Sequence, residues 1–264
     1  MAFSSSQSKT LAILPKITGA ISLIGSTYIF QDVILHKKTK HRVYHRLMLG
    51  LSCSDMIASV VNILSTWPSP TGTPGVMYAS GTTQTCTAQG FFNELGNMAT
   101  PLYNASLCLY YVLVIRMQWP EQNIKKKAEP YMHLLPICIA LLISILGIPF
   151  TLYNNSGWLC WIAQYPKSCS ADDGTCTRGE HSNIFRWVHY AIIWSAILFV
   201  TGGMYSIYRM VKRQERARSQ GSSKSKKVAI QAALYVGGLY LTWIFTTVSL
   251  FYLVYRCCVY MVFL

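Results

Sequence analysis

Apolar residues along this chain form long blocks rather than short alternating runs. A helix of about 20 apolar residues crosses the hydrocarbon core of a bilayer, which is ~30 Å thick. Six blocks reach that length, and we expect spans at residues 11–35, 44–67, 88–119, 131–153, 184–210 and 228–252. The pattern therefore predicts an all-α membrane protein in which residues 1–264 form one transmembrane helical domain.

The connectors between these blocks alternate in charge. The first, third and fifth connectors, with the block ends beside them, hold 17 of the 23 basic residues, whereas the second and fourth hold only Lys167 and Arg178. Basic connectors of membrane proteins stay in the cytoplasm. We therefore expect these three connectors inside, the N-terminus outside and the protein in the plasma membrane. Residues 120–130, between the third and fourth blocks, are expected to form a short loop.

Composition supports a lipid environment. Only 12% of the residues are charged and 52% are apolar, whereas a soluble domain carries roughly 25% charged residues. The net charge of +14 is also typical of proteins that bind nucleic acids, which is the alternative interpretation. Because the basic residues are confined to short connectors, we expect the lipid bilayer, and not a nucleic acid, to be the partner of this charge.

The end of the chain leaves two readings open. After the sixth block too few residues remain for a loop and another span, and the tail is apolar up to Leu264. Either the bundle has six spans, or the sequence stops before a seventh. The apolar tail favours the second reading.

Four cysteines fall on the predicted outer face: Cys86, Cys160, Cys169 and Cys176. An even number of exterior cysteines is typical of disulfides in an oxidising compartment. Three pairings are possible, and we predict Cys86 with Cys160 and Cys169 with Cys176. The four residues lack paired C-x-x-C spacing, so we expect no zinc or other metal here.

Ionisable residues inside spans usually face the bundle interior. Asp55 in the second block must find hydrogen-bond partners, bind a cation or be protonated. One interpretation is a conformational switch or a sodium site. The other is a structural residue with no switching role.

A polar stripe runs along the third block. Asn93, Asn97 and Asn104 share one helix face, and Glu94 lies about two turns from Cys86. A ligand entering from outside would reach Glu94 and Asn97, which we expect to bind it. The alternative is that Glu94 pairs with His189 or with another group at the outer end of the fifth block.

Asn154 begins the sequon Asn-Asn-Ser in the predicted outer connector, so we expect glycosylation there. No phosphate-binding glycine loop, metal-ligand helix or nucleophile–base pair is evident. We therefore expect neither an enzyme nor a cofactor.

Several short motifs carry a family resemblance. Residues 51–55, Leu-Ser-Cys-Ser-Asp, resemble the second-helix L-x-x-x-D motif of rhodopsin-like receptors. Residues 158–162, Trp-Leu-Cys-Trp-Ile, are similar to the W-C-W-I of the cyclic AMP receptor-like group known from slime moulds, and residues 243–245, Trp-Ile-Phe, to its C-W-V-F. The chain thus resembles the seven-helix G-protein-coupled receptors.

This resemblance implies a bundle of seven helices, an extracellular ligand and a heterotrimeric G protein as partner. It implies that Trp161 and His189 contact the ligand and that Trp243 acts as a switch. Arg116, Lys212 and Arg213 would contact the G protein.

The chain departs from the rhodopsin-like pattern in four places. The first block has Gly25-Ser26 where rhodopsin-like receptors carry Gly-Asn, and the third has no Asp-Arg-Tyr triplet. The sixth has no proline after Trp243, and no seventh block is present. The alternative function is a multi-pass transporter or channel, although no internal repeat supports it. A retinal protein needs a lysine in its last span, and no lysine follows Lys227.

Overall fold

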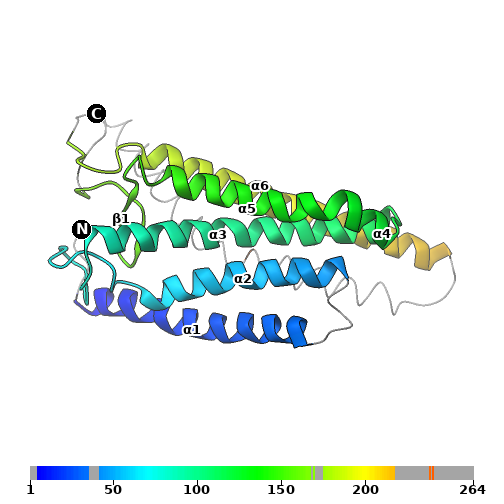
Figure 1. The fold of residues 1–264 in the computed structure, drawn as a ribbon, viewed down its shortest axis with the longest axis horizontal. Coiled ribbons are helices and arrows are strands. Elements are labelled where there is room, and N and C mark those ends of the chain that lie inside the picture. The colour runs from blue at the N-terminus through cyan, green and yellow to red at the C-terminus, as the bar shows by residue number, and fades with distance from the viewer. Residues whose placement is uncertain are drawn as a thin grey trace.

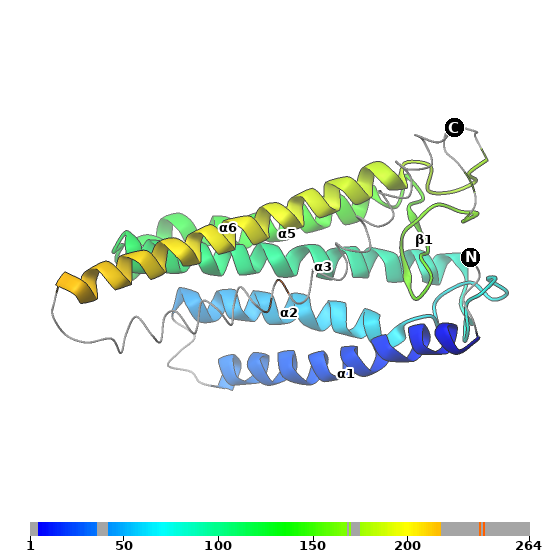
Figure 2. The ribbon, with the colours of Figure 1, turned by 180° about the vertical axis from the view of Figure 1, so that it is seen from behind.

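The computed structural model describes residues 5–35, 42–167, 169, 175–217, 238 and 240. Its long helices run side by side along one axis (Figures 1 and 2). The elements in chain order are α1 (Ser5–Leu35), α2 (Val43–Leu64), α3 (Thr83–Tyr111), η1 (Val112–Arg116), α4 (Glu121–Asn123), η2 (Ile124–Ala128), α5 (Glu129–Leu146), β1 (Tyr153–Asn155), β2 (Cys160–Ile162) and α6 (Ser182–Ala217). We call the end of the bundle at which β1 and β2 lie the hairpin end, and the end that carries Arg116 the basic end.

Five helical segments of the described chain are long and apolar enough to cross a membrane: Ser8–Leu35, Val43–Leu64, Thr83–Arg116, Glu121–Leu146 and Ser182–Arg213. A multi-pass helical membrane protein is therefore supported. The sixth predicted span, residues 228–252, lies outside the described residues except for Gly238 and Tyr240. The seven-helix bundle stays a prediction.

The surface of the bundle is apolar where lipid would contact it. Ile24 on α1, Leu142 on α5 and Leu198 on α6 are 72%, 57% and 63% exposed. Water would solvate such side chains poorly, whereas hydrocarbon solvates them well. In contrast, α3 is the central helix, since it packs against α2, α5, α6 and both strands. Figure 1 shows α3 between α2 and α5.

Small residues and buried apolar side chains hold α3 in place. At Gly96 a Cβ would lie 2.8 Å from the backbone nitrogen of Ala58, so α2 and α3 approach closely at a glycine, as membrane helices commonly do. Met98 and Leu107 are fully buried between the neighbouring helices. At the basic end, Arg46 of α2 donates two hydrogen bonds to the Glu129 carboxylate of α5, one of them at 2.7 Å.

Several predicted boundaries need correction. The helix α2 ends three residues early because Ser65 takes a φ of 47°. The helix α3 begins five residues early because Thr82 and Thr85 form a reciprocal capping box. The loop expected at residues 120–130 is wrong: α4, η2 and α5 follow one another without a gap, and Pro130 is the second residue of α5.

The fourth connector contains a hairpin that the sequence did not predict. β1 pairs with β2 antiparallel, with Tyr153 opposite Ile162 and Asn155 opposite Cys160. The fourth span accordingly ends at Leu146, and Tyr153 belongs to β1. The hairpin lies against the first turns of α3 (Figure 2), and this contact positions the candidate site.

Candidate functional site

Both predicted disulfides are present. Cys86 in the second turn of α3 is bonded to Cys160 in β2, with Cα atoms 5.3 Å apart. Cys169 is bonded to Cys176, with Cα atoms 5.0 Å apart. The first bond ties the hairpin to the central helix, and the second closes a small loop beyond the hairpin.

A buried carboxylate joins three elements just below the first disulfide. The Nε1–H of Trp161 in β2 donates to Oε2 of Glu94 in α3 at 2.6 Å. Nδ1 of His189 in α6 lies 2.6 Å from Oε1 of the same carboxylate. Glu94 is 0% exposed and His189 is 1% exposed. The expected alternative, a Glu94–His189 pair, is thus confirmed, and we call these three residues the Glu94 triad.

Aromatic rings surround the Glu94 carboxylate. The Trp161 ring meets His189 edge-on at 5.0 Å between centroids, and Tyr190 meets His189 at 5.4 Å. These rings limit the access of water to the carboxylate. A hydrogen bond in such surroundings is stronger than one in water, and an unpaired group is costlier. The triad is therefore a single unit, whose members separate only if another polar group replaces one of them.

The hairpin is also bonded to α3 and to the turn after α2 through Gln89. Its Oε1 accepts from the backbone N–H of Cys160 at 3.0 Å, and its Nε2 donates to the carbonyl of Ser65 at 2.7 Å. Gln89 is buried. Sequence reasoning missed this residue, although it lies three positions after Cys86 and so shares its helix face.

Tyr153 of β1 fills the space between α3 and the end of α5. Its hydroxyl donates to the carbonyl of Ser144 at 2.7 Å. Burial, and then the charge of Glu94, raise the pKa of Tyr153 above its ordinary value, while the hydrogen bond to Ser144 opposes this. The neutral phenol is therefore the stable form in the folded protein.

Two other predicted polar residues of the bundle have hydrogen-bond partners outside the Glu94 triad. Asn97 donates to Oδ1 of Asn93 at 2.8 Å. Asp55 accepts from the hydroxyl of Thr100 at 2.9 Å, as a structural residue would. Within the described ranges, no three His, Cys, Asp or Glu side chains gather as a metal site requires. A switch or sodium role for Asp55 stays a prediction.

At the basic end, arginines of two helices gather around a hollow of about 300 Å³. Its lining residues are Arg116, Ser206, Arg209, Met210 and Arg213. Arg116 donates to the hydroxyl of Ser206 at 3.2 Å, which joins η1 to α6. Lys212 instead lies over the ring of Tyr208, 5.6 Å from its centroid. Trp243 lies outside the described residues.

The position of Asn154 does not favour the expected glycosylation. Asn154 is 6% exposed. Its Nδ2, which would carry the sugar, donates to the carbonyls of Thr151 and Ala163 at 2.9 and 2.8 Å. A glycan would replace one of the two N–H donors of Nδ2, and so remove one of these hydrogen bonds, and it would need space that the folded hairpin does not offer.

Comparisons with known proteins add no family. No protein-family model matches the chain, and no curated protein matches it. The class is therefore defined by the structure alone: a multi-pass α-helical membrane protein with a disulfide-tethered hairpin over one end of its bundle.

Proposed function

We propose that this protein is a cell-surface receptor of the seven-helix, G-protein-coupled type, which transmits an extracellular signal to a heterotrimeric G protein. Five apolar spans, a central third helix and a hairpin covalently tied to that helix support this proposal. The resemblance of residues 51–55 and 158–162 to receptor motifs supports it further.

One observation carries the proposal: the central helix, together with η1 that continues it, is bonded to α6 near both ends of the bundle. At the hairpin end the bond is Glu94 to His189, and at the basic end it is Arg116 to Ser206. Along the central helix these contacts are roughly 30 Å apart, since 22 residues rise about 1.5 Å each. Movement of one helix against the other therefore changes both contacts.

The energy for this movement comes from differential binding. A ligand that offers a polar group to Glu94, and so replaces His189 or Trp161, binds one helix arrangement better than the other. The equilibrium between the two helix arrangements then shifts by the ratio of the ligand's affinities for them. At the other end, Arg116 and Arg213 become available to an acidic segment of the G protein.

The proposed orientation puts the hairpin end outside the cell. Disulfides persist in oxidising compartments, and both described disulfides lie at this end. The three lysines of η2 lie at the opposite end, as expected of cytoplasmic segments.

Nucleotide exchange tests the proposal without a known ligand. The whole chain is expressed in cell membranes with each class of heterotrimeric G protein, and GTP-analogue uptake is measured. We expect Glu94→Gln, which weakens the Glu94 triad, to raise basal uptake several-fold over the wild type, and Arg116→Ala added to it to abolish the gain. Glu180→Gln, at an exposed residue near the same end, is the matched control and should change nothing.

Uptake equal to that of membranes without the protein, for every G-protein class and for the Glu94→Gln variant, would contradict the proposal. Solute flux through liposomes holding the protein, with no exchange, would favour the transporter or channel instead. Labelling of a cysteine introduced at Lys126 from outside intact cells would contradict the orientation.

A further inference from the structure

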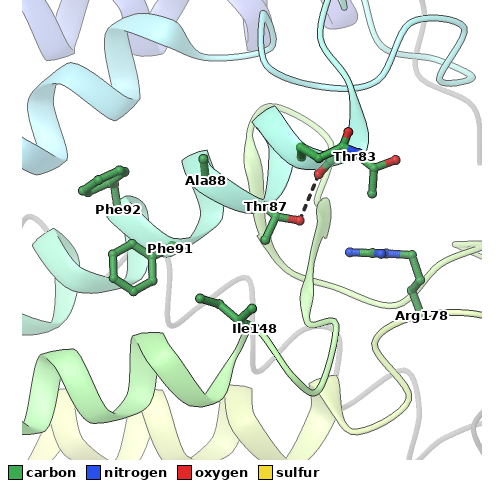
Figure 3. Close-up of a pocket in the computed structure, with 8 residues that line it drawn as sticks. Thr83, Thr87, Ala88, Phe91, Phe92, Ile148 and Arg178 are labelled. Atoms are coloured by element: carbon green, nitrogen blue, oxygen red, sulfur yellow. Dashed lines mark hydrogen bonds between the residues drawn. The ribbon is translucent and has the colours of Figure 1, made fainter.

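A second hollow opens on the side of the bundle at the hairpin end, between α3 and the end of α5, with a volume of about 500 Å³. Pockets for small ligands commonly measure ~300–1,000 Å³. Figure 3 shows its two unlike halves, with the rings of Phe91 and Phe92 on one side and Arg178 on the other. We call it the Arg178 pocket.

The apolar half presents exposed side chains at the hairpin end of the bundle. Phe92 is 48% exposed and Ile148 is 47% exposed, so both present a large apolar surface outside the bundle. Phe92 lies in the third turn of the span that begins at Thr83, and Ile148 lies two residues after the span that ends at Leu146. An alkyl chain resting on this surface would be shielded from water on one side by protein and on the other by lipid.

The polar half holds one fixed cation. Nε of Arg178 donates to Oδ1 of Asn154 at 2.8 Å, and the backbone of Arg178 is hydrogen-bonded to that of Tyr165 in both directions. Asn154 is itself held by two carbonyls. In Figure 3 the guanidinium points toward Thr83 and Thr87. The N–H groups on its terminal nitrogens therefore face the pocket as a preorganised fork.

The charge of the Arg178 pocket selects the head group. Arg178 is the only ionisable residue among the eight that line it, and the hydroxyl of Thr87 donates to the carbonyl of Thr83 at 2.9 Å. One guanidinium balances one negative charge, and its planar fork matches a carboxylate bidentately. A phosphate monoester would bring a second charge with no partner.

We propose that the Arg178 pocket binds a long-chain carboxylate, with its alkyl chain on Phe91, Phe92 and Ile148 and its carboxylate on Arg178. The occupant is a free single-chain amphiphile. This site is separate from the Glu94 triad, and its occupation does not depend on coupling to a G protein.

Photo-crosslinking tests this binding directly. The full chain in nanodiscs of neutral lipid is labelled with a diazirine analogue of hexadecanoate, and the sites are mapped by mass spectrometry. We expect labels around Phe92 and Ile148. Unlabelled hexadecanoate should compete at a concentration at least about tenfold lower than hexadecanol, since a charge-assisted hydrogen bond is lost with the alcohol.

Matched variants assign the binding to this pocket. Arg178→Gln should reduce labelling about tenfold, whereas Lys167→Gln, at the other basic residue of the same connector, should change it less than twofold. Ala88→Trp should block labelling by filling the hollow, because Ala88 lines it with an exposed small side chain. Retention of the Cys86–Cys160 disulfide shows that a variant has folded. If Arg178→Gln does not fold, Ala88→Trp decides the question.

Three results would overturn the proposal. The first is equal competition by hexadecanol, which would leave no role for the carboxylate. The second is stronger competition by lysophosphatidate or by added phosphatidylserine, which would assign the pocket to a phosphate head group or to a bilayer lipid. The third is labelling that persists in both Arg178→Gln and Ala88→Trp.

Discussion

Nδ1 of His189 lies 2.6 Å from Oε1 of Glu94, and both side chains are closed off from solvent. The two residues belong to α6 and α3, which are distant in sequence. A buried ionisable group without its partner is far costlier than the pair. The Glu94–His189 pair therefore contributes both to the packing of α3 against α6 and to the polar chemistry of the candidate site.

A double-mutant cycle measures this relationship. Glu94→Ala and His189→Ala should each lower the free energy of unfolding by about 3–5 kcal/mol, because each removes one side of a buried polar contact. The double variant should lose clearly less than the sum of the two. Unfolding in detergent, followed by tryptophan fluorescence, gives the values. Strictly additive losses would mean that the two side chains do not interact.

The two disulfides should differ in their contribution to stability. Closing a loop removes more entropy from the unfolded chain when the loop is longer. The bridged residues are 74 apart for Cys86–Cys160 and 7 apart for Cys169–Cys176. The loop-entropy relation then gives about 4.5 and about 2.5 kcal/mol. In the same assay, we expect the paired Cys→Ala variant without Cys86 and Cys160 to lose more free energy of unfolding than the variant without Cys169 and Cys176. The reverse order would contradict the role of the first bond as the main tether.

Gly90 should not tolerate a side chain. A Cβ there would lie 2.5 Å from Cδ1 of Tyr153, in the body of the ring rather than at a flexible end. Gly90→Ala should therefore destabilise the protein by about 1–3 kcal/mol through overpacking. Gly202→Ala, on a helix with open space at the Cβ position, is the matched control and should be neutral or slightly stabilising. Equal melting temperatures for the two variants would show that Tyr153 does not pack against α3 as described.

Asn154 should carry no N-linked glycan. We expect endoglycosidase to leave the electrophoretic mobility of the protein from eukaryotic cells unchanged. Tyr78→Asn provides the positive control because it creates a sequon with Ala79 and Ser80, at an exposed residue whose φ of 63° suits asparagine. A mobility shift in the control alone supports the buried position of Asn154. A shift in the wild type that Asn154→Gln removes would contradict it.

Features set by long stretches of composition were predictable from the sequence. Apolar blocks of span length and the positions of basic connectors need no tertiary information, so the described spans were found to within a few residues at most ends. The position of four cysteines on one predicted face indicated disulfides there, although it left three pairings possible, of which the predicted one is present. Glu94 and His189 were recognised as possible partners because two ionisable groups at the same depth of a bundle have few other choices.

Features set by tertiary contacts were not predictable. The strands of the hairpin are three residues each, too short to give an alternating pattern. Their buried polar groups have partners in other segments: Trp161 bonds Glu94 of α3, and Asn155 bonds Ser69 after α2. Asn154 is the clearest case: its sequon suggests exposure, whereas hydrogen bonds to Thr151, Ala163 and Arg178 bury it. The Arg178 pocket likewise combines residues from three separate segments.

The bond between Cys86 and Cys160 makes a covalent ring of the chain between them, which includes α3 and α5. Midway round this ring, at the far end of the bundle, Met117 and Trp119 are exposed in the turn before α4. A protease that cuts only this turn opens the ring without dividing the molecule. The nicked protein should migrate as one species on a non-reducing gel and fall into two fragments once dithiothreitol is added.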